Sequence, residues 1–147
     1  WKYNNLIKDF DLTKGFIRGK IGEFLCLEYE KDRLGISEEI EWTSEMHPKK
    51  EYDIKSFIDA SKTENLYIES KATIGNRLII PRSEWNYLIQ NSQKKYFIYL
   101  WDISDIKQPS LYINRQPKEF DSLGLVLKDS ENIKWAELRY ELKFEDA

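Results

Sequence analysis

Two strand-like segments joined by a short polar loop constrain the fold of this chain more than any other feature. Residues 52–54 and 65–71 are rich in aromatic and β-branched side chains, whereas residues 59–63 are small and polar. This pattern predicts a β-hairpin. With the loop centred on Ser61, three pairs oppose one another: Asp53 with Glu69, Lys55 with Tyr67, and Phe57 with Asn65.

The predicted register brings two carboxylates together. Side chains alternate along a strand, so Glu69 and Lys71 share one face, and the pairing places Asp53 on that face. Opposed residues have Cβ atoms roughly 4.5–5.5 Å apart, and two carboxylates at that separation repel unless a cation intervenes. Mg²⁺ uses one or two protein carboxylates together with waters and phosphate oxygens.

A structural interpretation competes with the metal site. Asp53, Lys55, Glu69 and Lys71 would then form a neutral, solvated patch of cross-strand ion pairs, each contributing at most ~1 kcal/mol to stability. Residue spacing by itself favours this interpretation.

A family resemblance shifts the balance. Asp53, followed sixteen residues later by Glu69-Ser70-Lys71, resembles the PD-(D/E)XK nuclease superfamily, although Tyr52 replaces the usual proline before the aspartate. Residues 19–23 resemble the opening helix of that superfamily, in which a glutamate often completes the metal site, and residues 82–85 and 96–99 resemble the following helix and strand. The most similar group that we can name is the NO VEIN carboxy-terminal domains, a restriction-endonuclease-like set found in prokaryotic defence proteins and elsewhere. The resemblance covers about residues 15–103.

This resemblance implies an α/β domain, with a restriction-endonuclease-like mixed β-sheet flanked by helices in the order αβββαβ. It also implies Mg²⁺-dependent hydrolysis of DNA phosphodiester bonds, with Mn²⁺ as a substitute metal. Asp53, Glu69 and the Ser70 carbonyl would hold the metal. Lys71 would position or activate the attacking water and offset charge, and Glu23 would orient Lys71 or a metal-bound water.

Two other functions stay open at this point. The first is a nuclease fold kept as a nucleic-acid-binding or assembly module without turnover, which the acidic pI supports. The second is a relative that cuts RNA, because the motif acts on phosphate and never touches the 2′-hydroxyl. The facing carboxylates beside a lysine argue against the first, since a binding module has no physical need for them.

Three basic residues are candidate phosphate contacts. Arg77 and Arg82 flank the start of a helix expected from an N-cap at Ser83 to about residue 91, where free backbone N–H groups and the helix dipole favour an anion. Lys20, near the start of the first helix, is the third candidate.

Composition limits how such a domain could bind DNA. The chain has 147 residues, 33% of them charged and 41% hydrophobic, which predicts one folded domain over residues 1–147. Its net charge is −3 and its pI about 5.4, so it lacks a general basic surface. Affinity would come from a local patch, a homodimer, or additional domains or subunits. The first residue is Trp1, and we expect a domain cut from a longer protein.

Other features predict the cellular setting. Cys26 is the single cysteine, which excludes an intrachain disulfide, and no long apolar run indicates secretion or membrane insertion. We therefore expect a cytoplasmic protein. The lone His47 is interpreted as a loop residue.

The remaining pattern predicts the order of elements. A helix is expected over residues 14–34, with Gly35 as its stop and a stripe of Gly15, Gly19 and Gly22 pressed against a sheet. Further predictions are helical spacing at 1–13, a short strand at 40–43 followed by turns, an extended piece at 78–80, a buried parallel strand at 96–103, and later strands at 123–127 and 138–144.

Overall fold

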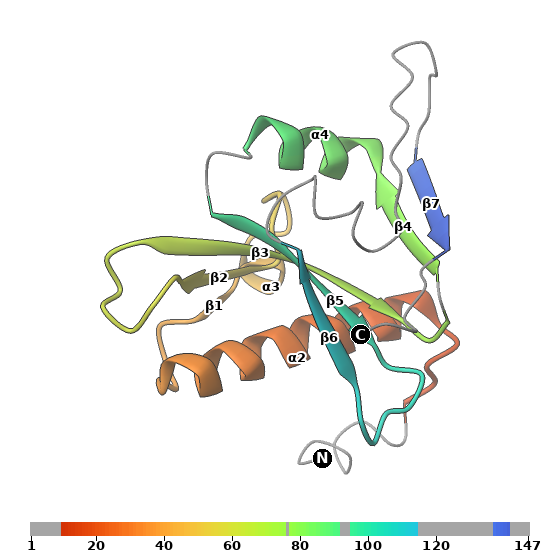
Figure 1. Cartoon of the computed structure of the whole chain (residues 1–147), viewed down its shortest axis with the longest axis horizontal. Helices are drawn as coiled ribbons and strands as arrows, with labels where there is room; N and C mark the ends of the chain where they lie inside the picture. Colours follow the sequence, from red (N-terminus) through yellow and green to blue (C-terminus); the bar gives the residue numbers. More distant parts are fainter. Residues whose placement is uncertain (1–9, 76, 92–94, 115–136, 142–147) are drawn as a thin grey trace.

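A mixed β-sheet lies between two helices. The computed structural model describes residues 10–75, 77–91, 95–114 and 137–141. Helix α2 (Gly15–Leu34) packs along one face of the sheet, and helix α4 (Arg82–Gln90) lies on the opposite side (Figure 1). The predicted α/β class is therefore confirmed.

The sheet has five strands in the order β1-β2-β3-β5-β6. Their bounds are β1 (Glu41–Trp42), β2 (Ile54–Phe57), β3 (Asn65–Thr73), β5 (Tyr96–Asp102) and β6 (Ser110–Asn114). All neighbouring pairs are antiparallel except β3 and β5, which are parallel. The expected order of one helix, three antiparallel strands, a helix and a parallel strand is confirmed.

A second sheet accompanies the crossover between β3 and β5. It pairs β4 (Arg77–Pro81) with β7 (Glu137–Glu141) in antiparallel fashion. The extended piece expected at 78–80 lies in β4, and the part of the expected last strand that the structure describes lies in β7. Helix α4 follows β4 directly, so the crossover consists of a strand and a helix.

The hairpin register follows the prediction. Lys55 pairs with Tyr67, and Phe57 pairs with Asn65. The ladder ends at the pair formed by Ile54 and Ile68, which leaves Asp53 one residue outside it. Both isoleucines are fully buried in the core beneath α2, because directly opposed residues of two paired strands point to the same face of the sheet.

Helix α2 also keeps its predicted bounds. Gly35 adopts φ of +69° as the C-cap, and its N–H donates to the Lys31 carbonyl. At Gly22, an added Cβ would lie 2.9 Å from the Cβ of Ala72, so a side chain there would push the helix off β3. Gly19 has nothing within 4 Å of such a Cβ. The close approach predicted for the glycine stripe is therefore limited to Gly22.

Some boundaries differ from the prediction. The strand expected at 40–43 ends at Trp42, because the chain turns into the one-turn helix α3 (Thr43–Met46) instead of a simple turn. Helix α4 begins at Arg82, directly after Pro81, so Ser83 lies inside its first turn and is not the N-cap. Strand β6 was not predicted; it begins after Pro109, which cannot donate to a ladder.

Several predictions lie outside the described residues: most of the helical spacing at 1–13, the strand at 123–127, and the last residues of the strand at 138–144. Among the residues that the structure describes, no helix is long and apolar enough to cross a membrane.

Candidate functional site

The candidate site lies at the edge of β3 where its pairing with β2 ends. The Asp53 N–H donates to the Ile68 carbonyl over 2.9 Å, and the Ser70 N–H donates to Asp53 Oδ2, also over 2.9 Å. The Asp53 carboxylate thus accepts the hydrogen bond that a backbone carbonyl would accept if the pairing of β2 with β3 continued. Because the N–H and C=O of one strand residue point to the same edge, the Ser70 carbonyl faces the Asp53 side of β3.

Carboxylates from two elements, β3 and α4, contact Lys71. Its Nζ lies 3.6 Å from Glu69 Oε1 on the same strand, and it also donates to Glu84 Oε2 from the first turn of α4. Glu69 is 7% exposed, and the Lys71 side chain is 17% exposed. The strand edge therefore carries a lysine between two carboxylates, with Asp53 beside them.

Burial dominates the electrostatics of Asp53. All contributions together raise its pKa to about 6; desolvation is the largest of them, and the N–H of Ser70 partly opposes it. The negative charges of Glu23 and Glu84 raise the pKa further, whereas the Lys71 ammonium lowers it. The net result is a carboxyl group that loses its proton less readily than an ordinary aspartate.

The pKa values of Glu69 and Lys71 reflect the same excess of negative charge at the site. Burial raises the pKa of Glu69 well above its usual range, and the charge of Asp53 adds to that rise. Burial alone would lower the pKa of Lys71, but the carboxylates of Glu69 and Glu84 outweigh it and raise that pKa. One ammonium is thus shared among several carboxylates, and a further cation would relieve the imbalance.

Tyr96, at the start of β5, places its hydroxyl beside the Glu69 carboxylate. The residue is 2% exposed, and its hydroxyl lies 3.1 Å from the Glu51 carbonyl and 3.5 Å from Glu69 Oε2. Burial raises the pKa of this tyrosine, so its hydroxyl keeps its proton and can donate. The sequence pattern identified Tyr96 only as a strand residue.

Glu23 approaches from α2, as the helix spacing suggested, but its contacts differ from the expected ones. It is 8% exposed and accepts hydrogen bonds from the Ser44 hydroxyl and, over 3.4 Å, from Trp42 Nε1. The contacts described for Lys71 are with Glu69 and Glu84. Glu23 acts on the site through its charge, which raises the pKa of Asp53.

The three candidate phosphate contacts are in different situations. Lys20 forms an ion pair with Glu45 and lies 3.9 Å from Glu23 Oε2, so acidic neighbours already neutralise it. Arg77 begins β4 and Arg82 begins α4. Their side chains lie outside the described part of the structure, and their phosphate contacts stay predictions.

Glu84, like Tyr96, is a site residue that the sequence pattern does not identify. The sequence predicts only that residues 82–85 belong to the helix after the hairpin. A signal was present, because a crossover from β3 to a parallel neighbour carries its helix across one face of the sheet. The first turn of that helix then lies near the β3 side chains of that face, which include Lys71.

The described residues contain no large cluster of metal-binding side chains. Within residues 10–75, 77–91, 95–114 and 137–141, no group of three or more His, Cys, Asp and Glu side chains is arranged to hold a metal ion. The predicted Mg²⁺ ligands are fewer: the carboxylates of Asp53 and Glu69 and the carbonyl of Ser70. All three are oxygen donors, and desolvation has raised the pKa of both carboxyl groups. This donor set suits Mg²⁺, which keeps several waters.

Comparison with protein families supports the resemblance. A family model described as "Protein NO VEIN, C-terminal" matches residues 22–113. The chain belongs to this family. The match begins within α2 and ends within β6, so it includes the candidate site and all of the five-stranded sheet except the last residue of β6. Neither curated proteins nor solved structures gave a significant match. The wider relationship to the PD-(D/E)XK superfamily stays a prediction.

Proposed function

We propose that this NO VEIN C-terminal domain is a Mg²⁺-dependent nuclease that hydrolyses phosphodiester bonds in DNA. The observation that carries the proposal is the pair of desolvated carboxyl groups, Asp53 and Glu69, beside the Lys71 ammonium at a strand edge. Buried carboxylates without a full complement of cations are costly to stability. A site that keeps them is suited to binding a divalent cation and a phosphate.

Each residue then has a defined task. Asp53, Glu69 and the Ser70 carbonyl would hold Mg²⁺ or Mn²⁺, which when bound lowers the pKa of water and neutralises charge on the phosphate. Lys71 would position the attacking water and offset the negative charge that develops on the phosphate. Glu23 would add negative potential beside Asp53 and anchor α2 to Ser44.

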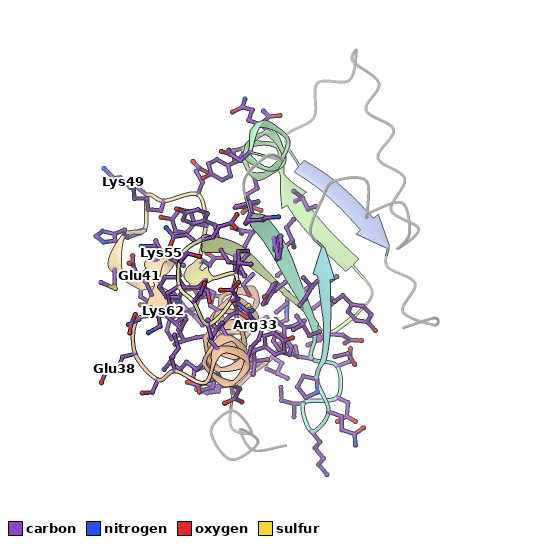
Figure 2. All side chains as sticks on the ribbon, turned by 60° about the vertical axis from the view of Figure 1, so that its left-hand side comes forward. Arg33, Glu38, Glu41, Lys49, Lys55 and Lys62 are labelled. Carbon is purple, nitrogen blue, oxygen red and sulfur yellow. The ribbon has the colours of Figure 1, made fainter. Side chains whose placement is uncertain are left out.

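Substrate binding would need help from outside this domain. Figure 2 labels Lys49, Lys55 and Lys62 on the same side of the molecule as Glu38 and Glu41, so both signs of charge are present there. A net charge of −3 supports the same conclusion. Arg77 and Arg82 remain the proposed phosphate contacts, and additional domains, subunits or a second copy of this chain would supply target recognition. We place this activity in the cytoplasm, in a prokaryotic restriction or defence system.

A second candidate is a nuclease fold that binds or assembles without turnover. The observation that favours it is the pairing of the basic residues nearest the site: Lys20 with Glu45, and Lys71 with Glu84. Such a domain would bind its partner equally well with or without Mg²⁺.

A cleavage assay separates the two. The domain is incubated with duplex DNA, single-stranded DNA and RNA in Mg²⁺, Mn²⁺ or EDTA, and Mg²⁺ binding is measured by calorimetry. We expect metal-dependent DNA cleavage. Glu69→Gln, which keeps shape but removes a metal-binding charge, should abolish cleavage and weaken Mg²⁺ binding together.

The matched control is Glu39→Gln, because Glu39 is also ion-paired, with Lys62 at 2.7 Å, but is exposed. It should leave both readouts unchanged. Cleavage of RNA without cleavage of DNA would show that the substrate is RNA. Absence of cleavage, with Mg²⁺ binding unaffected by Glu69→Gln, would support the binding module.

A further inference from the structure

The Lys71 ammonium is held by α4 as well as by its own strand. Its Nζ donates to Glu84 Oε2, whereas it lies 3.6 Å from Glu69 Oε1, beyond hydrogen-bonding distance. A lysine side chain has a flexible four-carbon stem and loses considerable rotamer freedom when it is held. The contact that fixes the end of this side chain is therefore the one with Glu84.

The position of Glu84 follows from the crossover. Helix α4 begins immediately after β4, and Glu84 is the acidic residue of its first turn. Figure 1 shows α4 on the side of the sheet away from α2. Ser70 packs toward Gly22 of α2 on one face of β3, so Glu69 and Lys71, on the alternate positions, face α4. With its side chain 25% exposed, Glu84 stands at the rim of the site.

The contact with Glu84 affects which other carboxylates the Lys71 ammonium can reach. Glu69 and Asp53 are the other carboxylates whose charges raise the pKa of Lys71. A released ammonium would settle against them, because the attraction between opposite charges rises as they approach. It would then occupy the carboxylate oxygens that a cation needs.

We propose that Glu84 is the positioning residue of this site: it holds the Lys71 ammonium near Asp53 and Glu69 without letting it occupy them. This inference rests on the proposed function for its kinetic consequence, but the placement of Lys71 can be measured without it. Charge and position are separable here. Glu84→Asp keeps the charge and shortens the side chain by one methylene, whereas Glu84→Gln keeps the length and removes the charge.

The experiment uses the full chain labelled with ¹³C-lysine. In the wild type, a fixed Lys71 side chain gives two distinct signals for its ε-methylene protons in nuclear magnetic resonance spectra, and Lys71→Met assigns them. We expect both Glu84 variants to merge these signals. The control Glu39→Asp shortens another ion-paired glutamate and should affect Lys62 and leave Lys71 unchanged.

Kinetics supply the second readout. In both Glu84 variants, kcat should fall about 10-fold or more, as for other residues that orient a metal site, while KM for DNA stays within about twofold. Unchanged Lys71 signals in both variants, or unchanged kcat in both, would overturn the proposal. If the wild type cuts nothing, the proposed function fails, and the Lys71 signals alone decide whether Glu84 positions it.

Discussion

Glu30 and Glu69 are both buried glutamates, but their surroundings differ. Glu30, on α2, is fully buried and accepts hydrogen bonds from Arg33 Nε at 2.7 Å and Arg33 Nη2 at 2.6 Å, and from the Tyr99 hydroxyl at 3.1 Å. Arg33 also donates to the Ile58 carbonyl over 2.7 Å, which ties the helix to the end of the hairpin. One positive charge here neutralises one negative charge.

Among the residues that the structure describes, Glu69 lacks such a dedicated partner. The nearest cation among them is Lys71 at 3.6 Å, which Glu84 also binds, and the Tyr96 hydroxyl lies 3.5 Å away. Asp53 adds a second negative charge that raises the pKa of Glu69. The comparison shows that burial of a carboxylate does not by itself indicate function. What distinguishes Glu69 is that its surroundings leave part of its charge unbalanced.

The largest expected effect comes from removing the shared cation of the site. Lys71→Met keeps the apolar stem and removes the ammonium, so cleavage should fall by two or more orders of magnitude, on the order of 3 kcal/mol of transition-state stabilisation. Mg²⁺ binding should persist or tighten, because a nearby positive charge is gone. Single-turnover cleavage and calorimetry measure the two effects. Loss of Mg²⁺ binding in this variant would contradict the assigned roles.

The Glu30 cluster should respond in stability and not in activity. Glu30→Gln leaves Arg33 without its charge partner, and we expect a loss of about 3 kcal/mol in the free energy of unfolding. Urea denaturation measures it, with the exposed Glu39→Gln as a control that should change stability by less than ~0.5 kcal/mol. Cleavage per folded molecule should stay unchanged. A stable Glu30→Gln variant with impaired cleavage would remove the distinction between the two glutamates.

The pH dependence of stability should reveal the unbalanced charge. The pKa of Asp53 rises from the ordinary 3.8 to about 6 on folding. Between these pH values the unfolded chain has released a proton that the folded chain keeps. The free energy of unfolding should therefore fall as pH rises from about 4 to about 6, by on the order of 2 kcal/mol.

Asp53→Asn should remove this part of the slope and make the metal-free protein more stable than the wild type at about pH 7. Urea denaturation in EDTA at several pH values measures both curves. If the free energy of unfolding depends on pH in the same way in wild type and variant, folding does not raise the pKa of Asp53.

The smallest effect concerns DNA affinity. Because Lys20 is paired with Glu45 and the chain is acidic, few phosphates should be neutralised on binding. The isolated domain should bind DNA weakly, with a slope of log K against log salt of about −2 or shallower. Fluorescence anisotropy across a salt series measures it. Tight binding with a steep slope would indicate a basic surface formed by residues other than Lys20, Arg77 and Arg82.

Residue spacing along the sequence was enough to predict several features of the fold. The bounds of α2 follow from apolar spacing and from Gly35, because glycine adopts φ of +69° at no steric cost. The hairpin register follows from the loop centre and the period of two along a strand, and it is confirmed by the pairing of Lys55 with Tyr67. The parallel placement of β5 follows from an apolar strand reached by a crossover.

The amino-acid sequence by itself determined that Asp53, Glu69 and Lys71 share one region, because neighbours in a hairpin are set by local register. The tertiary structure decided which charges pair: Lys71 with Glu84, and Lys20 with Glu45. A third of the chain is charged, so each lysine has many acidic residues within possible reach. The choice among them depends on distances between elements that only packing brings together, and those distances decide which carboxylates have a cation of their own and which share one.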